Sequence, residues 1–143
     1  MNQTVRDAMV SEPTTLGVAA SAQEAGLCLG ERDDVRAVFV VEDNGRLVGV
    51  ITRKTLVRGV VAAGRDPREV PLREIAEPPL FTLEAALPLD EGFHMLEEHD
   101  LERVPVVEEG GRLVGVLSRA VVQRRLAEDE PPEFDQDPGS VVL

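Results

Sequence analysis

The chain has 143 residues, 43% of them hydrophobic and neither Trp nor Tyr among them, so an aliphatic core must hold the fold together. Its formal net charge of −12 argues against sequence-independent binding of nucleic acid, which requires a basic surface. The single cysteine, Cys28, the lack of a signal-peptide pattern and the lack of an apolar run near 20 residues predict a cytoplasmic protein without a membrane span.

The first predicted elements are an extended segment and a helix. Residues 11–16 are read as extended because Pro13 disfavours a helical conformation for its neighbour. Ser21 and Glu24 have the spacing of a capping box, so a helix is predicted to begin there and to end near Gly30. Apolar residues three and four apart predict its buried stripe, which comprises Ala22, Ala25, Cys28 and Leu29.

A hairpin and a second helix are predicted next. The β-branched runs 38–41 and 47–51 are separated by Asn44-Gly45, a strong signal for a hairpin turn. Thr52 then stands where a helix N-cap is needed, and the following helix would bury Leu56 and Val60 before it ends at Gly64.

The second half of the chain repeats the first. The residues Arg-Leu-Val-Gly-Val occur at 46–50 and again at 112–116, and the flanking residues follow in step. Pro88 suits the first position of a helix, and Ser118 takes the place of Thr52 before the last helix. The predicted buried faces of these two helices comprise Leu89, Gly92, Phe93 and Leu96, and Val122 and Leu126.

The repeated unit is therefore strand, helix, strand, strand, helix, which predicts an α+β fold. We assign residues 1–64 to the first repeat, 65–71 to a linker and 72–127 to the second repeat. Because a copy of about 60 residues is marginal alone, the two sheets are expected to pack together. Residues 128–143 contain six acids and three prolines, which predicts a disordered or loosely docked tail.

This ordered set of motifs, occurring twice over residues 4–127, resembles a tandem pair of CBS domains. The resemblance is carried by the lead-in at 5–9, the strand at 104–107, the turn, and the Gly-hydrophobic-hydrophobic-Thr/Ser step that ends at Thr52 and Ser118. It implies β-α-β-β-α repeats packed with pseudo-twofold symmetry and two clefts that bind AMP, ADP, ATP or S-adenosylmethionine. It also implies a homodimer that regulates an effector protein, here expected on another polypeptide.

The same resemblance suggests which residues would bind the ligand. Thr52 and Ser118 would offer hydroxyls to an anion at a helix start, where helix capping alone is the alternative interpretation. The family has an Asp three residues later that holds the ribose hydroxyls, and here Thr55 and Val121 replace it. Arg53 and Arg119 would meet phosphates or serve only as surface charges, and the first cleft is expected to be the better anion site. The predicted ligand-binding set comprises Thr15, Leu16, Val38, Thr52, Arg53, Thr55, Thr82, Ser118 and Arg119.

Other chemistry is poorly represented. His94 and His99 are five residues apart and do not share a helix face, so no metal site is predicted. No P-loop, dinucleotide fingerprint or nucleophile elbow is present, so we do not expect an enzyme. Two hypotheses remain. The first is a stand-alone regulatory module that senses an adenine nucleotide or a related anion, and the second is a ligand-free dimerisation or scaffold module with degenerate clefts.

Overall fold

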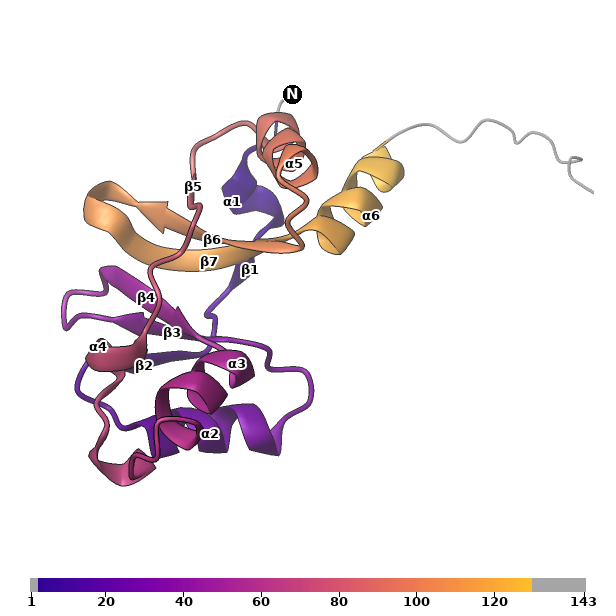
Figure 1. Cartoon of the computed structure of the whole chain (residues 1–143). Coiled ribbons are helices and arrows are strands. Elements are labelled where there is room, and N and C mark those ends of the chain that lie inside the picture. Colours follow the sequence, from indigo (N-terminus) through magenta and orange to yellow (C-terminus); the bar gives the residue numbers. More distant parts are fainter. Residues whose placement is uncertain (1–2, 130–143) are drawn as a thin grey trace, which may run out of the picture.

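The computed structural model describes residues 3–129, with side chains as far as residue 127. Helices and strands are mixed, and two sheets lie one above the other (Figure 1). The lower sheet has the order β2 (Thr15–Gly17), β3 (Val38–Val41), β4 (Leu47–Ile51). The upper sheet has the order β1 (Val10–Ser11), β7 (Arg112–Ser118), β6 (Arg103–Glu108), β5 (Leu83–Glu84).

The first repeat follows the predicted order of elements. Helix α2 (Ala22–Glu31) begins with the predicted capping box, in which the Ser21 N–H donates to Glu24 Oε2 at 3.0 Å. Strands β3 and β4 form the predicted antiparallel hairpin, and Gly45 provides the turn with a φ of 88°. Beyond it, the single helix that we predicted is divided into α3 (Arg53–Leu56) and a π-helical turn, η1 (Val57–Val61).

The second repeat has the same plan. Helix α5 (Leu89–Glu98) follows β5, and the hairpin of β6 and β7 turns through a short 3-10 segment, η3 (Glu109–Gly111). The prediction that Pro88 is the first helical residue of α5 is wrong. Pro88 is the N-cap instead, because its ψ of 140° is extended. Helix α6 (Arg119–Asp129) ends the described part of the chain, so residues 130–143 of the predicted tail lie outside it.

Each repeat packs against the chain segment that precedes the other repeat. Helix α1 (Val5–Ala8) packs on the second repeat, and β1 pairs with β7 so that Val10 lies opposite Val116. Helix α4 (Leu72–Ile75), which follows the 3-10 turn η2 (Pro67–Glu69), packs on the first repeat. Glu77 pairs there with Val50, the residue that corresponds to Val116. This reciprocal exchange is consistent with a pseudo-twofold axis between the repeats. The repeat boundaries at residues 64 and 72 remain a prediction.

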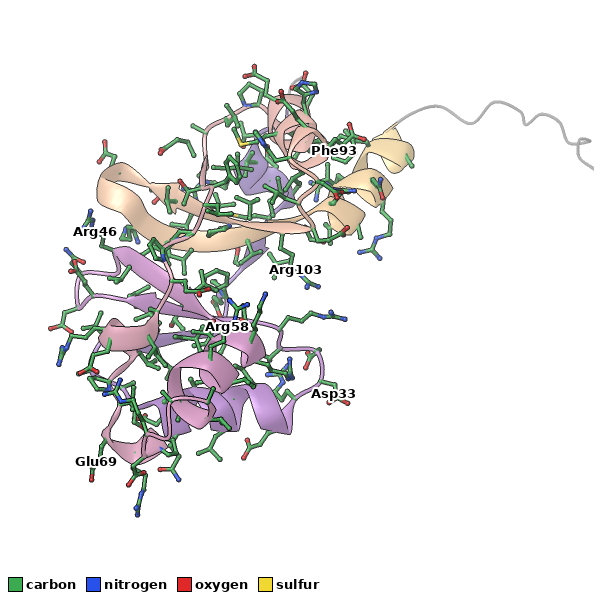
Figure 2. All side chains as sticks on the ribbon, in the orientation of Figure 1. Asp33, Arg46, Arg58, Glu69, Phe93 and Arg103 are labelled. Carbon is green, nitrogen blue, oxygen red and sulfur yellow. The ribbon has the colours of Figure 1, made fainter. Side chains whose placement is uncertain are left out.

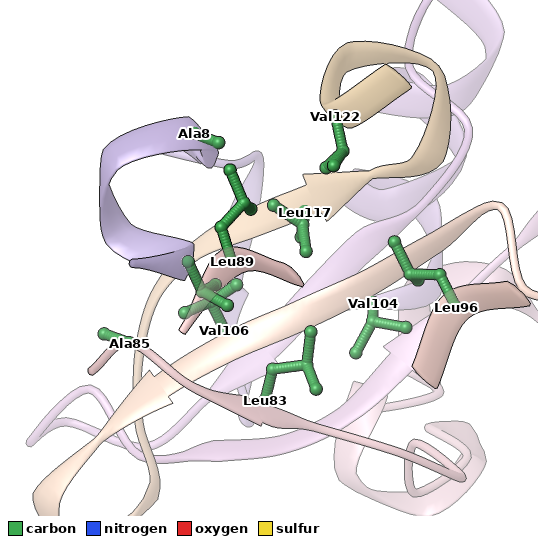
Figure 3. Close-up of a cluster of buried hydrophobic side chains, with 10 residues drawn as sticks. Ala8, Leu83, Ala85, Leu89, Leu96, Val104, Val106, Leu117 and Val122 are labelled. Carbon is green, nitrogen blue, oxygen red and sulfur yellow. The ribbon is translucent and has the colours of Figure 1, made fainter. Parts of the chain in front are cut away.

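Two aliphatic cores result from the exchange. The upper core combines Val5 and Ala8 of the lead-in with Leu89, Leu96 and other residues of the second repeat (Figure 3). The lower core likewise takes Leu72 from α4. The predicted stripe of α2 is confirmed for Ala22, Ala25 and Leu29, which are buried, and Cys28 is partly buried against the lower core.

The repeated phrase contains a glycine because the exchanged segment passes directly over it. A Cβ atom at Gly115 would stand 2.6 Å from Met9 Sδ and 2.7 Å from the Val10 carbonyl oxygen. A Cβ atom at Gly49 would stand 2.8 Å from Ala76 Cβ. Both distances are shorter than van der Waals contact, so only glycine allows the lead-in backbone to lie this close.

Within residues 3–129 the structure contains no helix that is both long enough and apolar enough to cross a membrane.

Candidate functional site

A hollow of about 550 Å³ lies between the two repeats and takes its walls from both. Phe39 and Val50 line it from the lower sheet, and Pro105 and Val116, the residues that correspond to them in the second repeat, line it from the upper sheet. The hollow therefore spans the pseudo-twofold axis. Its volume falls in the range of about 300–1,000 Å³ that is typical of small-molecule sites.

The hollow extends from these apolar walls to Ser118, which ends β7 directly before helix α6. Val121, one helical turn later, lines the same side. A hydroxyl beside the first turn of an 11-residue helix favours an anion, because the first backbone N–H groups of a helix have no partner within it. Val121 offers an apolar surface and no hydrogen bond.

Charged side chains surround the rim of the hollow. Arg32 forms an ion pair with Asp34 at 2.9 Å, and this guanidinium holds the pKa of the Asp34 carboxyl below its usual value. Arg36 and Arg103 also line the hollow, and neither makes an ion pair with any side chain in the described part of the chain. Figure 2 shows Arg103 at the side of the upper sheet that faces the lower repeat. Two guanidinium groups are thus available to an anionic ligand.

Thr52 and Thr55 form the cap of helix α3. The Thr55 N–H donates to Thr52 Oγ1 at 3.3 Å, and the Thr52 N–H donates to Thr55 Oγ1 at 3.1 Å. Thr55 is only 4% exposed. The capping interpretation of Thr52 therefore has direct support, and the hydroxyl of Thr55 is already used inside the protein.

Arg53 and Arg119 have equivalent structural roles in the two repeats. Arg119, whose side chain is 21% exposed, donates to the carbonyl oxygens of Leu101 at 3.1 Å and Leu96 at 3.4 Å, and to Asp100 Oδ1 at 3.1 Å. Arg53 donates to the carbonyl oxygen of Leu29, near the end of α2. Each arginine thus joins the second helix of its repeat to the end of the first, where a cation also complements the helix dipole.

The remaining predicted site residues do not line the hollow. Val38 is fully buried in the lower core, and Leu16 packs against that core. Thr15, the first residue of β2, and Thr82, directly before β5, are exposed. Of the nine predicted ligand-binding residues, only Ser118 lines the hollow between the repeats.

Glu12, Arg36 and Arg103 line the hollow but were not predicted from the sequence. No motif marks them, since each becomes a lining residue only when the two repeats are packed together. Arg103 was the easiest of the three to predict. It directly precedes the hydrophobic run 104–107, and a charged residue at the start of a buried strand lies at the exposed edge of the sheet.

Two further hollows lie outside this cleft. One of about 570 Å³ is lined mainly by polar residues, among which Arg6 and Arg112 both pair with Glu108. The other, of about 400 Å³, is an apolar groove over α2 and η1, beside the exposed side chains of Leu27 and Val61.

No group of three or more His, Cys, Asp or Glu side chains is placed to hold a metal ion among the residues that the structure describes. His99 instead stacks on Phe81 with ring centroids 4.3 Å apart. His94 lies 3.9 Å from Glu98 and is exposed.

The fold and the hollow together define a two-repeat module with a ligand-sized cavity between its halves. The sequence matches the CBS domain twice, over residues 5–62 and 72–128. The chain therefore belongs to the CBS-domain family, as its motifs had predicted, and it has the tandem arrangement.

Hypoxic response protein 1 of Mycobacterium tuberculosis (strain CDC 1551 / Oshkosh) is 32% identical over 131 residues, which are 92% of this chain and 90% of that protein. The crystal structure of Hypoxic Response Protein I with two coordinated zinc ions has a TM-score of 0.72 and covers 86% of this chain and 98% of its own. CBSX2 in complex with AMP has a TM-score of 0.70 at 25% identity and covers 87% and 96%. The cytosolic domain of the Mg²⁺ channel MgtE in complex with ATP has a TM-score of 0.65 at 25% identity and covers 82% and 46%.

Proposed function

We propose that this protein is a regulatory module that binds an adenine nucleotide in the hollow between its repeats and passes the binding event to a partner protein. The observation that carries the proposal is the hollow itself, which combines apolar walls from both repeats with Ser118 and two free guanidinium groups. An adenine ring suits the apolar walls, and phosphates suit Arg36 and Arg103. AMP in CBSX2 and ATP in the MgtE domain support this class of ligand.

The regulatory mechanism follows from the walls of the hollow. A ligand that contacts both repeats favours the relative position of the repeats in which both contacts form. It shifts the population of conformations only by its difference in affinity for them. Helix α1 packs in the upper core and β1 pairs in the upper sheet, while Glu12, Pro13 and Thr14 line the hollow, so the ligand also contacts the segment that joins the two sheets.

Calorimetry tests this proposal with AMP, ADP, ATP and S-adenosylmethionine added to the full chain. We expect saturable heat with at least one of the four and a rise in melting temperature with the same compound. Absorbance at 260 nm provides an independent check for nucleotide retained during purification, since the protein has neither Trp nor Tyr. The absence of heat, thermal shift and retained nucleotide together would overturn the proposal.

A homodimer is the second part of the proposal. Leu27 on α2 is 54% exposed and Val61 on η1 is 72% exposed, and both line the apolar groove over these two helices. An apolar patch of this kind on a soluble protein is typical of an interaction surface. Sedimentation should therefore show a dimer that Val61→Glu weakens, while the exposed substitution Arg124→Glu leaves it intact. A wild-type monomer at micromolar concentration would contradict this part alone.

The same apolar face favours the alternative, a ligand-free dimerisation module. Val121 also supports it, because the side chain at that position gives the hollow no polar group. A stable dimer without calorimetric response to the four compounds would establish this alternative in place of nucleotide sensing.

A further inference from the structure

Glu12 has an unusual backbone conformation at the edge of the hollow. Its φ is 55°, in the left-handed region that non-glycine residues rarely adopt. It lies between β1, which belongs to the upper sheet, and β2, which belongs to the lower sheet, so the chain turns from one sheet to the other at this residue. A left-handed conformation costs a residue with a Cβ atom about 1–2 kcal/mol relative to the right-handed one. Such an outlier justifies a search for the function of its side chain.

Asp100 is the other non-glycine residue with positive φ among residues 3–129, at 54°. Its side chain has a clear role, since its carboxylate accepts from Arg119 at 3.1 Å. Glu12 has no corresponding partner, because no hydrogen bond or ion pair joins its carboxylate to any described residue. The strained residue that lines the hollow is therefore the one whose acceptor atoms are still available.

Two carboxylates line the hollow, those of Glu12 and Asp34. Asp34 is held by Arg32 through two hydrogen bonds, at 3.3 and 2.9 Å. Glu12 is therefore the carboxylate that a ligand can use. A carboxylate only accepts hydrogen bonds and repels phosphate, so it suits the hydroxyl or amino part of a ligand whose anionic part meets Arg36 and Arg103.

In an adenine nucleotide, the two adjacent ribose hydroxyls can both donate hydrogen bonds to one carboxylate. Helix α6 offers them no acceptor in the hollow, because the side chain there is that of Val121. We propose that Glu12, in the segment between β1 and β2, accepts hydrogen bonds from the ribose hydroxyls of the bound nucleotide. This inference rests on the proposed function and assigns the sugar specificity of the site to a residue outside the helix.

The test compares the affinity of the full chain for AMP with that for 2′,3′-dideoxyadenosine 5′-monophosphate. A hydroxyl that donates to a carboxylate contributes about 1.5–3 kcal/mol, so the wild type should prefer AMP by roughly 10-fold to 100-fold. In Glu12→Gln, whose amide oxygen is only a neutral acceptor, the preference should fall to roughly 2-fold to 10-fold and below that of the wild type, chiefly through weaker binding of AMP. Asp33→Asn removes the same charge from an exposed residue outside the lining and should keep the wild-type preference.

Glu12→Gly separates binding from folding. Glycine adopts a φ of 55° without strain, so this variant should melt at or above the wild-type temperature and still lose the preference for AMP. A wild-type preference for AMP that persists in both Glu12 variants would overturn the role of Glu12 and leave nucleotide binding standing. Failure of the wild type to bind either compound would instead overturn the proposed function together with this inference.

Discussion

The exchange of lead-in segments predicts a specific loss of stability when Gly115 is replaced by alanine. The added Cβ would stand 2.7 Å from the Val10 carbonyl oxygen and 2.6 Å from Met9 Sδ. Met9 can move, but the carbonyl belongs to the β1–β7 pairing and moves only with the strand. Overpacking of this kind costs about 1–3 kcal/mol, which for a protein of this size lowers the melting temperature by roughly 3–10 °C.

Thermal and urea denaturation measure this effect, and two glycines serve as controls. Gly49→Ala should be destabilising in the same way, because its Cβ would stand 2.8 Å from Ala76 Cβ and 3.0 Å from the Glu77 carbonyl oxygen. Gly30→Ala should stabilise by about 0.5–1 kcal/mol, since it lies in α2 with no atom within 4 Å of the added Cβ. A Gly115→Ala variant as stable as the wild type would refute the close approach of the exchanged segment.

Three further predictions concern single side chains. Arg119→Ala should lower the free energy of unfolding by about 1–3 kcal/mol, measured by urea denaturation, because it removes charge-assisted hydrogen bonds to the end of α5. Ser118→Ala should weaken AMP binding about 3-fold to 10-fold by calorimetry, the loss expected for one hydroxyl in the hollow. Asp7→Asn should destabilise the protein at pH 7 but not at low pH. The Thr4 backbone N–H and hydroxyl hold the pKa of Asp7 below its usual value of 3.8, so the contribution of this carboxylate to stability is present above that value and is lost as pH falls through the lowered pKa.

Two of these predictions have a matched control variant. Arg124→Ala changes an exposed arginine of the same helix and should leave stability unchanged. Thr52→Ala removes the equivalent hydroxyl of the first repeat, and it should cost about 1 kcal/mol of stability as a cap while AMP affinity is kept. Equal loss of affinity in both hydroxyl variants, or a stability difference for Asp7→Asn that grows as pH falls, would contradict the assignments.

Much of the fold was predictable from sequence because its signals are local. The capping box at Ser21, the turn at Asn44-Gly45 and the repeated phrase each specify neighbouring backbone, and all three predictions are confirmed. The exchange of lead-ins was not predictable, since nothing in residues 5–9 indicates which repeat their apolar side chains will cover. The glycine at the fourth position of the phrase, Gly49 and Gly115, is the sequence feature that the close approach explains.

The site was less predictable than the fold. Thr52 and Ser118 occupy equivalent places in the sequence, yet Ser118 lines the hollow while Thr52 is engaged with Thr55. Arg53 and Arg119 correspond as a pair, and both bind backbone carbonyls inside their own repeats. Sequence patterns thus predicted the cap at Thr52 and the hairpin turn at Gly45 correctly. They could not indicate which residues of the two repeats face each other.

The most direct test of nucleotide binding between the repeats is a calorimetric titration of AMP into the wild type and into Ala37→Trp. Ala37 is partly exposed and lines the hollow directly before β3, so an indole there fills the space that the nucleotide needs. We predict saturable heat for the wild type and none for Ala37→Trp, with the variant folded and melting near the wild-type temperature. Absence of heat in the wild type, or wild-type affinity in Ala37→Trp, would contradict a nucleotide site in this hollow.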